Sequence, residues 1–201
     1  MRRRSGARSL AAILFTDIVD SSTQAARMGD QRWKELIARH HAIVRRELKR
    51  YGGRELDTAG DGFFASFGEP AAAIRCACTS AETVRQLGIE IRTGVHFGEC
   101  EHSGGKLGGL TVVVGARVMS LGAAGDVLIT GTTRELIGGA GFGFEDRGRH
   151  ALKGVEGEWH VFAVTEVDGA PRPPPIDAHE AEERRAAVQP ARALRRRTGL
   201  L

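Results

Sequence analysis

Apolar and polar positions follow one another in blocks along the chain, and the first block is the clearest. Six apolar residues, Leu10 to Phe15, are followed by Thr16 and Asp17. A short apolar run with polar ends predicts a strand that is buried on both faces. Asp17 would then lie at the carboxyl end of this strand, where an unpaired carboxylate is costly and needs a cation or a hydrogen-bond donor.

The rest of the chain shows helical and strand periodicity in turn. Apolar residues at three- and four-residue spacing predict helices, and strict alternation of apolar and polar residues predicts strands with one buried face. In chain order, the pattern predicts a strand over 10–15, a helix over 33–51, strands over 54–58 and 63–67, a helix from Pro70, a strand over 89–98, a helix over 111–121, a strand over 126–130, a helix over 132–137 and two late strands, the last over 159–167.

This order of elements predicts an α+β fold. Its first six elements match the ferredoxin-like βαββαβ core, an antiparallel sheet with helices on one face, and additional helices and C-terminal strands follow. The sheet face that these helices leave uncovered must then meet a ligand or a second subunit.

Two local features carry smaller expectations. The glycine-rich stretch 104–109 is expected to be a loop, and His96 is expected to be a hydrogen-bonded histidine at the surface.

Charge and composition divide the 201 residues into three parts. We expect a basic N-terminal extension over 1–9, one folded domain over 10–169, and a proline-rich linker with an arginine-rich tail over 170–201 that is disordered or partly helical. The two ends are rich in arginine, whereas the domain between them carries slightly more acidic than basic residues. This distribution argues against a nucleic-acid-binding domain. It leaves open a weak contact of the basic ends with a membrane surface.

The sequence predicts a cytoplasmic protein. No apolar run approaches the roughly 18 residues that span a bilayer. The apolar segment behind the first arginines is short and does not lead into the small-residue cleavage site of a signal peptide. The three cysteines, Cys76, Cys78 and Cys100, do not form the framework of a disulfide-stabilised secreted domain.

Two aspartates are candidates for a metal site. Asp17 ends the first predicted strand, and Asp61 lies in a glycine-flanked turn between the second and the third. The first and third strands are neighbours in the ferredoxin-like topology, so the two carboxylates can converge. Two carboxylates and the phosphates of a substrate are the usual ligands of Mg²⁺ or Mn²⁺. The alternative at Asp17 is an aspartate that caps the following helix.

Five segments resemble, in the right order, the motifs of the class III nucleotidyl cyclases. They are Phe15–Ser22, Asp57–Gly62, Ile91–Gly98, Gly115–Arg117 and Leu152–Gly154. The resemblance implies the class III cyclase fold and a homodimer with two sites, each built across the interface. It further implies conversion of a nucleoside triphosphate to a 3′,5′-cyclic nucleotide and pyrophosphate with two divalent cations, Mg²⁺ or Mn²⁺.

By position, the resemblance implies one group of site residues from each subunit. Asp17 and Asp61 would bind the metal ions together with the backbone carbonyl of Ile18, and Arg92 would contact phosphate from the same subunit. From the partner subunit would come Arg117, at the α-phosphate in the transition state, and Lys153, at the terminal phosphates. A guanidinium fork and an ammonium point charge suit these two roles.

Three positions depart from the family pattern. The base-reading lysine is replaced by Asp57, and the base-reading aspartate aligns with Lys106, which exchanges the two charges. The transition-state asparagine is replaced by Val113, which cannot donate a hydrogen bond. Losing one such donor typically costs on the order of 10²–10³ in rate. We therefore expect a slow cyclase with ATP as the favoured substrate. The alternative is a cyclase-homology module that binds nucleotide and metal with little or no turnover.

Overall fold

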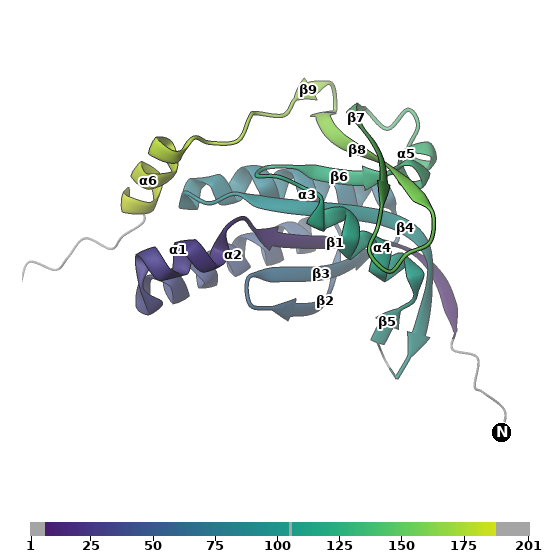
Figure 1. Cartoon of the computed structure of the whole chain (residues 1–201), viewed down its shortest axis with the longest axis horizontal. Helices are drawn as coiled ribbons and strands as arrows, with labels where there is room; N and C mark the ends of the chain where they lie inside the picture. The colour runs from purple at the N-terminus through teal and green to yellow at the C-terminus, as the bar shows by residue number, and fades with distance from the viewer. Residues whose placement is uncertain (1–6, 105, 188–201) are drawn as a thin grey trace, which may run out of the picture.

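The computed structural model describes residues 7–104 and 106–187 of the chain (Figure 1). Its strands are β1 (Arg8–Ile18), β2 (Arg54–Ala59), β3 (Gly62–Phe67), β4 (Ile91–Ser103), β5 (Lys106–Gly108), β6 (Val127–Thr130), β7 (Phe142–Ala151), β8 (Glu158–Val167) and β9 (Ala170–Pro171). Its helices are α1 (Ser21–Met28), α2 (Asp30–Arg50), α3 (Pro70–Val84), the short 3₁₀-helix η1 (Arg85–Leu87), α4 (Leu110–Ser120), α5 (Gly131–Leu136) and α6 (Ala178–Ala187).

One mixed sheet organises these elements, and it confirms the predicted fold class. The strand order is β2-β3-β1-β4-β6-β8-β7. The first four of these strands pair antiparallel, as a ferredoxin-like core requires. β6 then joins β4 in parallel, and β8 and β7 extend the sheet as an antiparallel pair.

The two faces of the sheet are covered differently. Helices α2 and α3 pack on one face, and the largest apolar core of the protein lies between them and the strands. On the other face, α4 packs against β1 and β4 (Figure 1). A Cβ atom on Gly94 would lie 2.3 Å from the backbone nitrogen of Met119, so this glycine allows α4 to approach the sheet closely. We call these the α2/α3 face and the α4 face.

The glycine-rich stretch after β4 is not the simple loop that the sequence predicts. β4 continues to Ser103, and β5 pairs back onto it in a hairpin that turns at Gly104. The glycines hide the strand pattern because they carry no side chain to alternate. Position 104 has φ of 58°, a left-handed conformation that glycine adopts without strain.

The expectation that His96 lies at the surface is wrong, although its side chain is hydrogen bonded as predicted. His96 is 5% exposed and its Nδ1 lies 2.7 Å from Oγ1 of Thr130. Its ring also stands edge-on to Trp159. The alternation along β4 correctly assigns His96 to the opposite side from Val95. The α4 face there is covered, however, so that side is buried too.

The ends of the chain lie partly outside the described residues. β1 begins at Arg8, so the sheet includes the last residues of the expected basic extension. At the other end, residues 172–177 run extended along the body, and α6 follows (Figure 1). Most of the terminal arginines on which a membrane contact would depend fall in the ranges 1–6 and 188–201, outside the described part. No described helix is long and apolar enough to cross a membrane.

Candidate active site

Asp17 and Arg92 form an ion pair at one end of the α4 face. They lie opposite each other on the neighbouring strands β1 and β4. Nε and Nη2 of Arg92 donate to Oδ2 of Asp17 at 3.1 Å and 2.6 Å. Both side chains are about one-third exposed or less. The aspartate therefore has a cationic partner and does not cap the following helix.

Asp61 meets the end of β1 from the tip of the β2–β3 hairpin. Its Oδ2 accepts a hydrogen bond from the backbone N–H of Ile18 at 3.1 Å. Ile18 directly follows Asp17, so the structure brings Asp17, Ile18 and Asp61 together, as the strand order predicts. This end of β1 also has a main-chain connection to the residue before β4, since the N–H of Val19 donates to the carbonyl of Glu90 at 3.0 Å.

The two aspartates fit a metal site that is completed by a substrate. In each carboxylate, Oδ2 takes the hydrogen bonds given above, and Oδ1 has no hydrogen-bond partner among the described residues. No group of three His, Cys, Asp or Glu side chains in the described part of the chain could hold a metal alone. Mg²⁺ accepts such a site because it is usually bound by one or two carboxylates together with waters and substrate phosphates.

His41 and Lys34, two residues of α2, belong to this region although the sequence did not single them out. Nε2 of His41 lies 3.0 Å from the carbonyl oxygen of Gly60, next to Asp61. Both side chains line a cavity of about 540 Å³ that Ser21, Ser22 and Asp61 also border. The paired histidines at 40 and 41 carried a signal: adjacent helical residues point to different sides, so only one can face the core. His40 is the buried one.

Arg117 and Lys153 are brought together elsewhere on the α4 side. Nε of Arg117, on α4, donates to the carbonyl oxygen of Lys153 at 3.0 Å. Lys153 lies in the turn between β7 and β8, and its side chain is exposed. The contact holds Arg117 toward this turn, and no described contact joins Arg117 to Asp17 or Arg92. One chain thus carries two separate groups of predicted site residues.

The three positions that depart from the family pattern lie on exposed parts of the fold. Val113 is 40% exposed on α4. Asp57 is exposed on the edge strand β2, where its Oδ1 accepts the N–H of Thr58 at 2.9 Å. Lys106 begins β5, opposite Ser103. β3, β1 and β4 separate the strands of Asp57 and Lys106, so the structure does not bring this pair together within one chain.

The pKa values of two nearby groups are shifted, and in both the cause is structural. Hydrogen bonds from Arg45 lower the pKa of Glu55, beside Asp57 on β2, to about 2. Burial lowers the pKa of His96 to about 4, so its imidazole is neutral at neutral pH. Each group therefore has a fixed charge state at neutral pH and helps to hold its strand.

Comparison with known families decides what this fold is. Residues 5–166 match the family described as adenylate and guanylate cyclase catalytic domain. The chain belongs to this family. The match covers β1 to β7 in full and β8 except its last residue, and it includes every site residue named above.

Individual cyclases show the same relation. A putative adenylate cyclase 3 of Rhizobium meliloti is 30% identical over 187 residues, which cover 89% of this chain and 32% of that protein. An adenylate cyclase of Lachancea kluyveri is 31% identical over 112 residues, or 43% of this chain and 6% of that protein. The chain therefore spans only about a third, or less, of the length of these curated relatives.

Solved cyclase structures share the fold. The adenylyl cyclase CyaB from P. aeruginosa superposes with a TM-score of 0.72 at 21% identity, over 79% of this chain and 94% of that one. The guanylate cyclase domain of RhGC from Catenaria anguillulae, in complex with GTP, superposes with a TM-score of 0.73 at 20% identity, over 80% of this chain and 99% of that one. Both adenylyl and guanylyl cyclase domains thus have this architecture.

Proposed function

We propose that the chain converts a nucleoside triphosphate, with ATP favoured, to a 3′,5′-cyclic nucleotide and pyrophosphate. In this reaction the ribose 3′ oxygen forms a bond to the α-phosphorus and loses its proton to solvent. The bond from that phosphorus to the bridging oxygen of pyrophosphate breaks. The observation that carries the proposal is the Asp17–Arg92 pair beside Asp61, an arrangement of acidic and basic groups suited to a metal-bound triphosphate.

The residues of the first group bind and orient the triphosphate end. The Oδ1 atoms of Asp17 and Asp61 and the carbonyl of Ile18 would hold two divalent cations, Mg²⁺ or Mn²⁺. Such ions lower the pKa of an attacking hydroxyl and stabilise a leaving oxygen. Arg92 would turn part of its guanidinium toward a phosphate oxygen and so bind the substrate while it keeps Asp17 in place.

The second group would come from another copy of the chain. Arg117 would stabilise charge on the α-phosphate, Lys153 would bind the terminal phosphates, and Asp57 and Lys106 would contact the base. The α4 face supports a homodimer because apolar side chains remain on it: Phe15 stacks on Phe64 at 4.6 Å between ring centroids. Leu110 and Val113, on α4, are 57% and 40% exposed. A cytoplasmic location stays a prediction.

A second candidate function rests on Val113. Where this position supplies no hydrogen-bond donor, the chain would bind metal and nucleotide with little turnover. Both candidates keep the metal carboxylates, so binding alone does not separate them.

The deciding experiment measures binding and product together. Purified protein is incubated with Mn²⁺ and either ATP or GTP, cyclic product is measured by mass spectrometry, and nucleotide binding is measured by calorimetry on the same sample. Cyclic product above the level of an Asp17→Asn variant supports the cyclase. Binding that depends on Asp17 without product supports the module, and absence of both contradicts the two proposals.

A further inference from the structure

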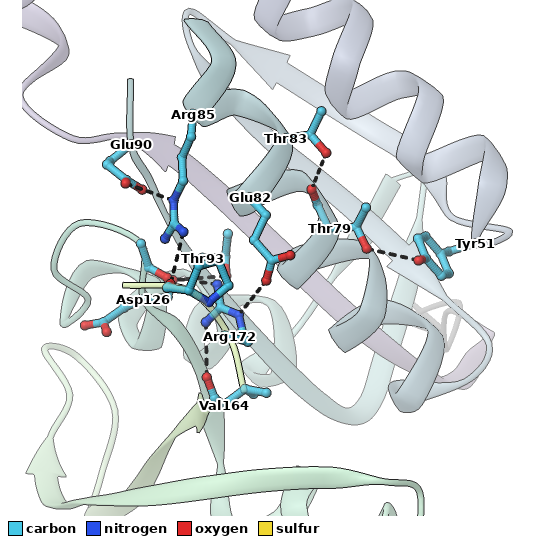
Figure 2. Close-up of polar contacts among 12 residues, drawn as sticks. Tyr51, Thr79, Glu82, Thr83, Arg85, Glu90, Thr93, Asp126, Val164 and Arg172 are labelled. Carbon is cyan, nitrogen blue, oxygen red and sulfur yellow. Dashed lines mark hydrogen bonds and ion pairs between the residues drawn. The ribbon is translucent and has the colours of Figure 1, made fainter. Parts of the chain in front are cut away.

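The segment that follows β9 is anchored to the body by a nearly buried arginine. The side chain of Arg172 is 8% exposed. Its guanidinium donates to the carbonyl oxygens of Val164 and Gly125, both at 3.1 Å, and pairs with Glu82 at 3.3 Å (Figure 2). A buried charge is tolerated only when it is paired and hydrogen bonded. These contacts therefore fix where the segment leaves the sheet.

A buried ion pair forms the second anchor. Arg85 and Glu90 lie 2.9 Å apart, and their side chains are 5% and 9% exposed (Figure 2). Arg85 donates to the carbonyl of Pro173 at 3.0 Å, and Oε1 of Glu90 accepts the N–H of Ile176 at 2.8 Å. Oε2 of Glu90 is buried without a hydrogen-bond partner among the described residues. The segment thus supplies the hydrogen bonds that make this pair tolerable in the interior.

The body is shaped to receive α6 at Gly88. This residue has φ of 71°, and a Cβ atom on it would lie 2.2 Å from the carbonyl oxygen of Ala181. Nη1 of Arg185 donates to the Gly88 carbonyl at 2.6 Å. A backbone approach this close leaves no room for a side chain. The helix therefore packs directly against the loop that leads into β4.

Glu90 joins this segment to the candidate active site. Its side chain holds Ile176, while its main-chain carbonyl accepts the N–H of Val19 at 3.0 Å. Val19 lies in the turn behind Asp17. Arg92, two residues beyond Glu90, pairs with Asp17 from β4. α6 also lies beside α1, the helix that this turn opens (Figure 1), where Glu182 and Arg27 are 3.8 Å apart.

We propose that residues 172–187 are a strap and that Glu90 is a positioning residue. Through Glu90 the docked strap holds residues 17–20, the end of β1 and the turn that follows it, in place for metal and substrate. The catalytic part of this inference rests on the proposed function. Release of the strap frees the Glu90 side chain from Ile176 and loosens the Val19 contact. Metal-bound triphosphate then binds more weakly, whereas Arg117 and Lys153, on other elements, are unaffected.

Two substitutions at one position isolate the strap contact in the full chain. Ile176→Ala and Ile176→Pro both remove the side chain, but only proline also removes the N–H that bonds Glu90. Hydrogen exchange of peptides that cover 17–20 should be about 10-fold faster in Ile176→Pro than in Ile176→Ala, because a local opening becomes easier. The KM for the Mn²⁺–nucleotide complex should rise several-fold with kcat changed less than about twofold, as expected when ground-state binding is lost.

A second pair of variants repeats the test at a more exposed contact. Arg185→Met removes the bond from α6 to Gly88, and Arg184→Met is its control, because Arg184 pairs with Glu180 within α6. The backbone amides of the turn should exchange faster only in Arg185→Met.

Equal hydrogen-exchange rates of this turn within both pairs of variants overturn the proposal, and so does a loss of kcat without a change in KM. A parent protein without cyclic product contradicts the proposed function alone, since exchange still tests the strap.

Discussion

One chain buries the apolar side chains on the two faces of the sheet to different extents. The α2/α3 face is closed by a continuous apolar core. On the α4 face, one helix covers the centre and leaves stacked Phe15 and Phe64 partly buried beside it. Asp17 and Arg92 lie on this second face, at its edge. The largest apolar core and the Asp17–Arg92 pair therefore lie on opposite faces of the sheet.

The proposed site residues fall into two groups. Asp17, Arg92 and Asp61 form the first group, and Arg117 and Lys153 form the second. Asp17, Arg92 and Asp61 already contact one another or the same turn within a single chain. Arg117 contacts Lys153, and no contact among the described residues joins it to the first group. Under the proposed function, the metal and phosphate contacts would be organised within one chain, whereas the transition-state contacts would need a second copy.

Removing the charge of Asp17 tests the metal-binding role of the first group. Asp17→Asn keeps an oxygen for Arg92 but loses the anionic ligand, so cyclic-nucleotide formation should fall by on the order of 10²-fold or more, since metal assistance contributes several kcal/mol to such reactions. Product formation in Mn²⁺ measures the change. Asp30→Asn, exposed at the start of α2, is the control and should keep parent activity. Parent-like turnover in Asp17→Asn would contradict the metal assignment.

Mixing two inactive proteins tests whether the second group acts from another copy of the chain. Asp61→Ala lacks a proposed metal ligand, and Arg117→Ala lacks the arginine proposed to act at the transition state. If each site takes these residues from different copies, an equal mixture should recover roughly a quarter of the parent activity, because half the dimers are mixed and each mixed dimer has one intact site. Mixed dimers detected by native mass spectrometry that stay inactive would show that one chain supplies both residues.

A hydrogen-bond donor introduced at position 113 tests whether Val113 limits turnover. Val113→Asn should raise kcat by about 10-fold or more with a smaller change in KM, because the new hydrogen bond strengthens as the transition state forms. Steady-state kinetics with ATP and GTP measure both constants. Val113→Leu, which is close to asparagine in size and has no donor, is the control. The same substitution belongs also in an Asp57→Lys, Lys106→Asp background, which should favour adenine. An unchanged kcat in both backgrounds would mean that another group supplies the donor.

Much of the first group could be predicted from the sequence because its signals are local. The apolar run of β1 ends at Asp17, and the glycine-flanked turn places Asp61 at a hairpin tip. The topology then follows from the order of the elements, since the first and third strands of this unit are neighbours. The structure places Asp61 against Ile18 as this reasoning requires.

The rest could not be predicted because it depends on contacts between distant residues. The alternation predicts that His96 is a surface residue, but the ring of Trp159, distant in the sequence, packs against it. The hairpin of β4 and β5 is hidden by its glycines. The course of the C-terminal segment depends on two contacts between distant residues: Arg172 with Glu82, and Arg85 with Pro173, which are 90 and 88 residues apart in the sequence. Proline content alone predicts an extended linker, and it does not say where that linker docks.

Acid should destabilise both faces of the sheet through one buried histidine on each. Burial, and then the charge of His41, lower the pKa of His40 on the α2/α3 face to about 3, and burial lowers that of His96 on the α4 face to about 4. Both values lie below the ordinary 6.5. The unfolded chain therefore binds more protons, and stability that is fully present above pH 6.5 is lost as the pH falls below it.

Substitutions separate the contributions of the two faces. Between pH 7.5 and 5.5 each histidine should lower the free energy of unfolding by about 1.4 kcal/mol. His40→Phe keeps an aromatic ring against Phe63 and removes two buried nitrogens that have no hydrogen-bond partner among the described residues. It should halve the pH dependence measured by urea unfolding. His96→Gln, which retains a polar group for Thr130, should remove the other half. A full pH dependence in the double variant would show that other groups, and neither face's histidine, take up the protons.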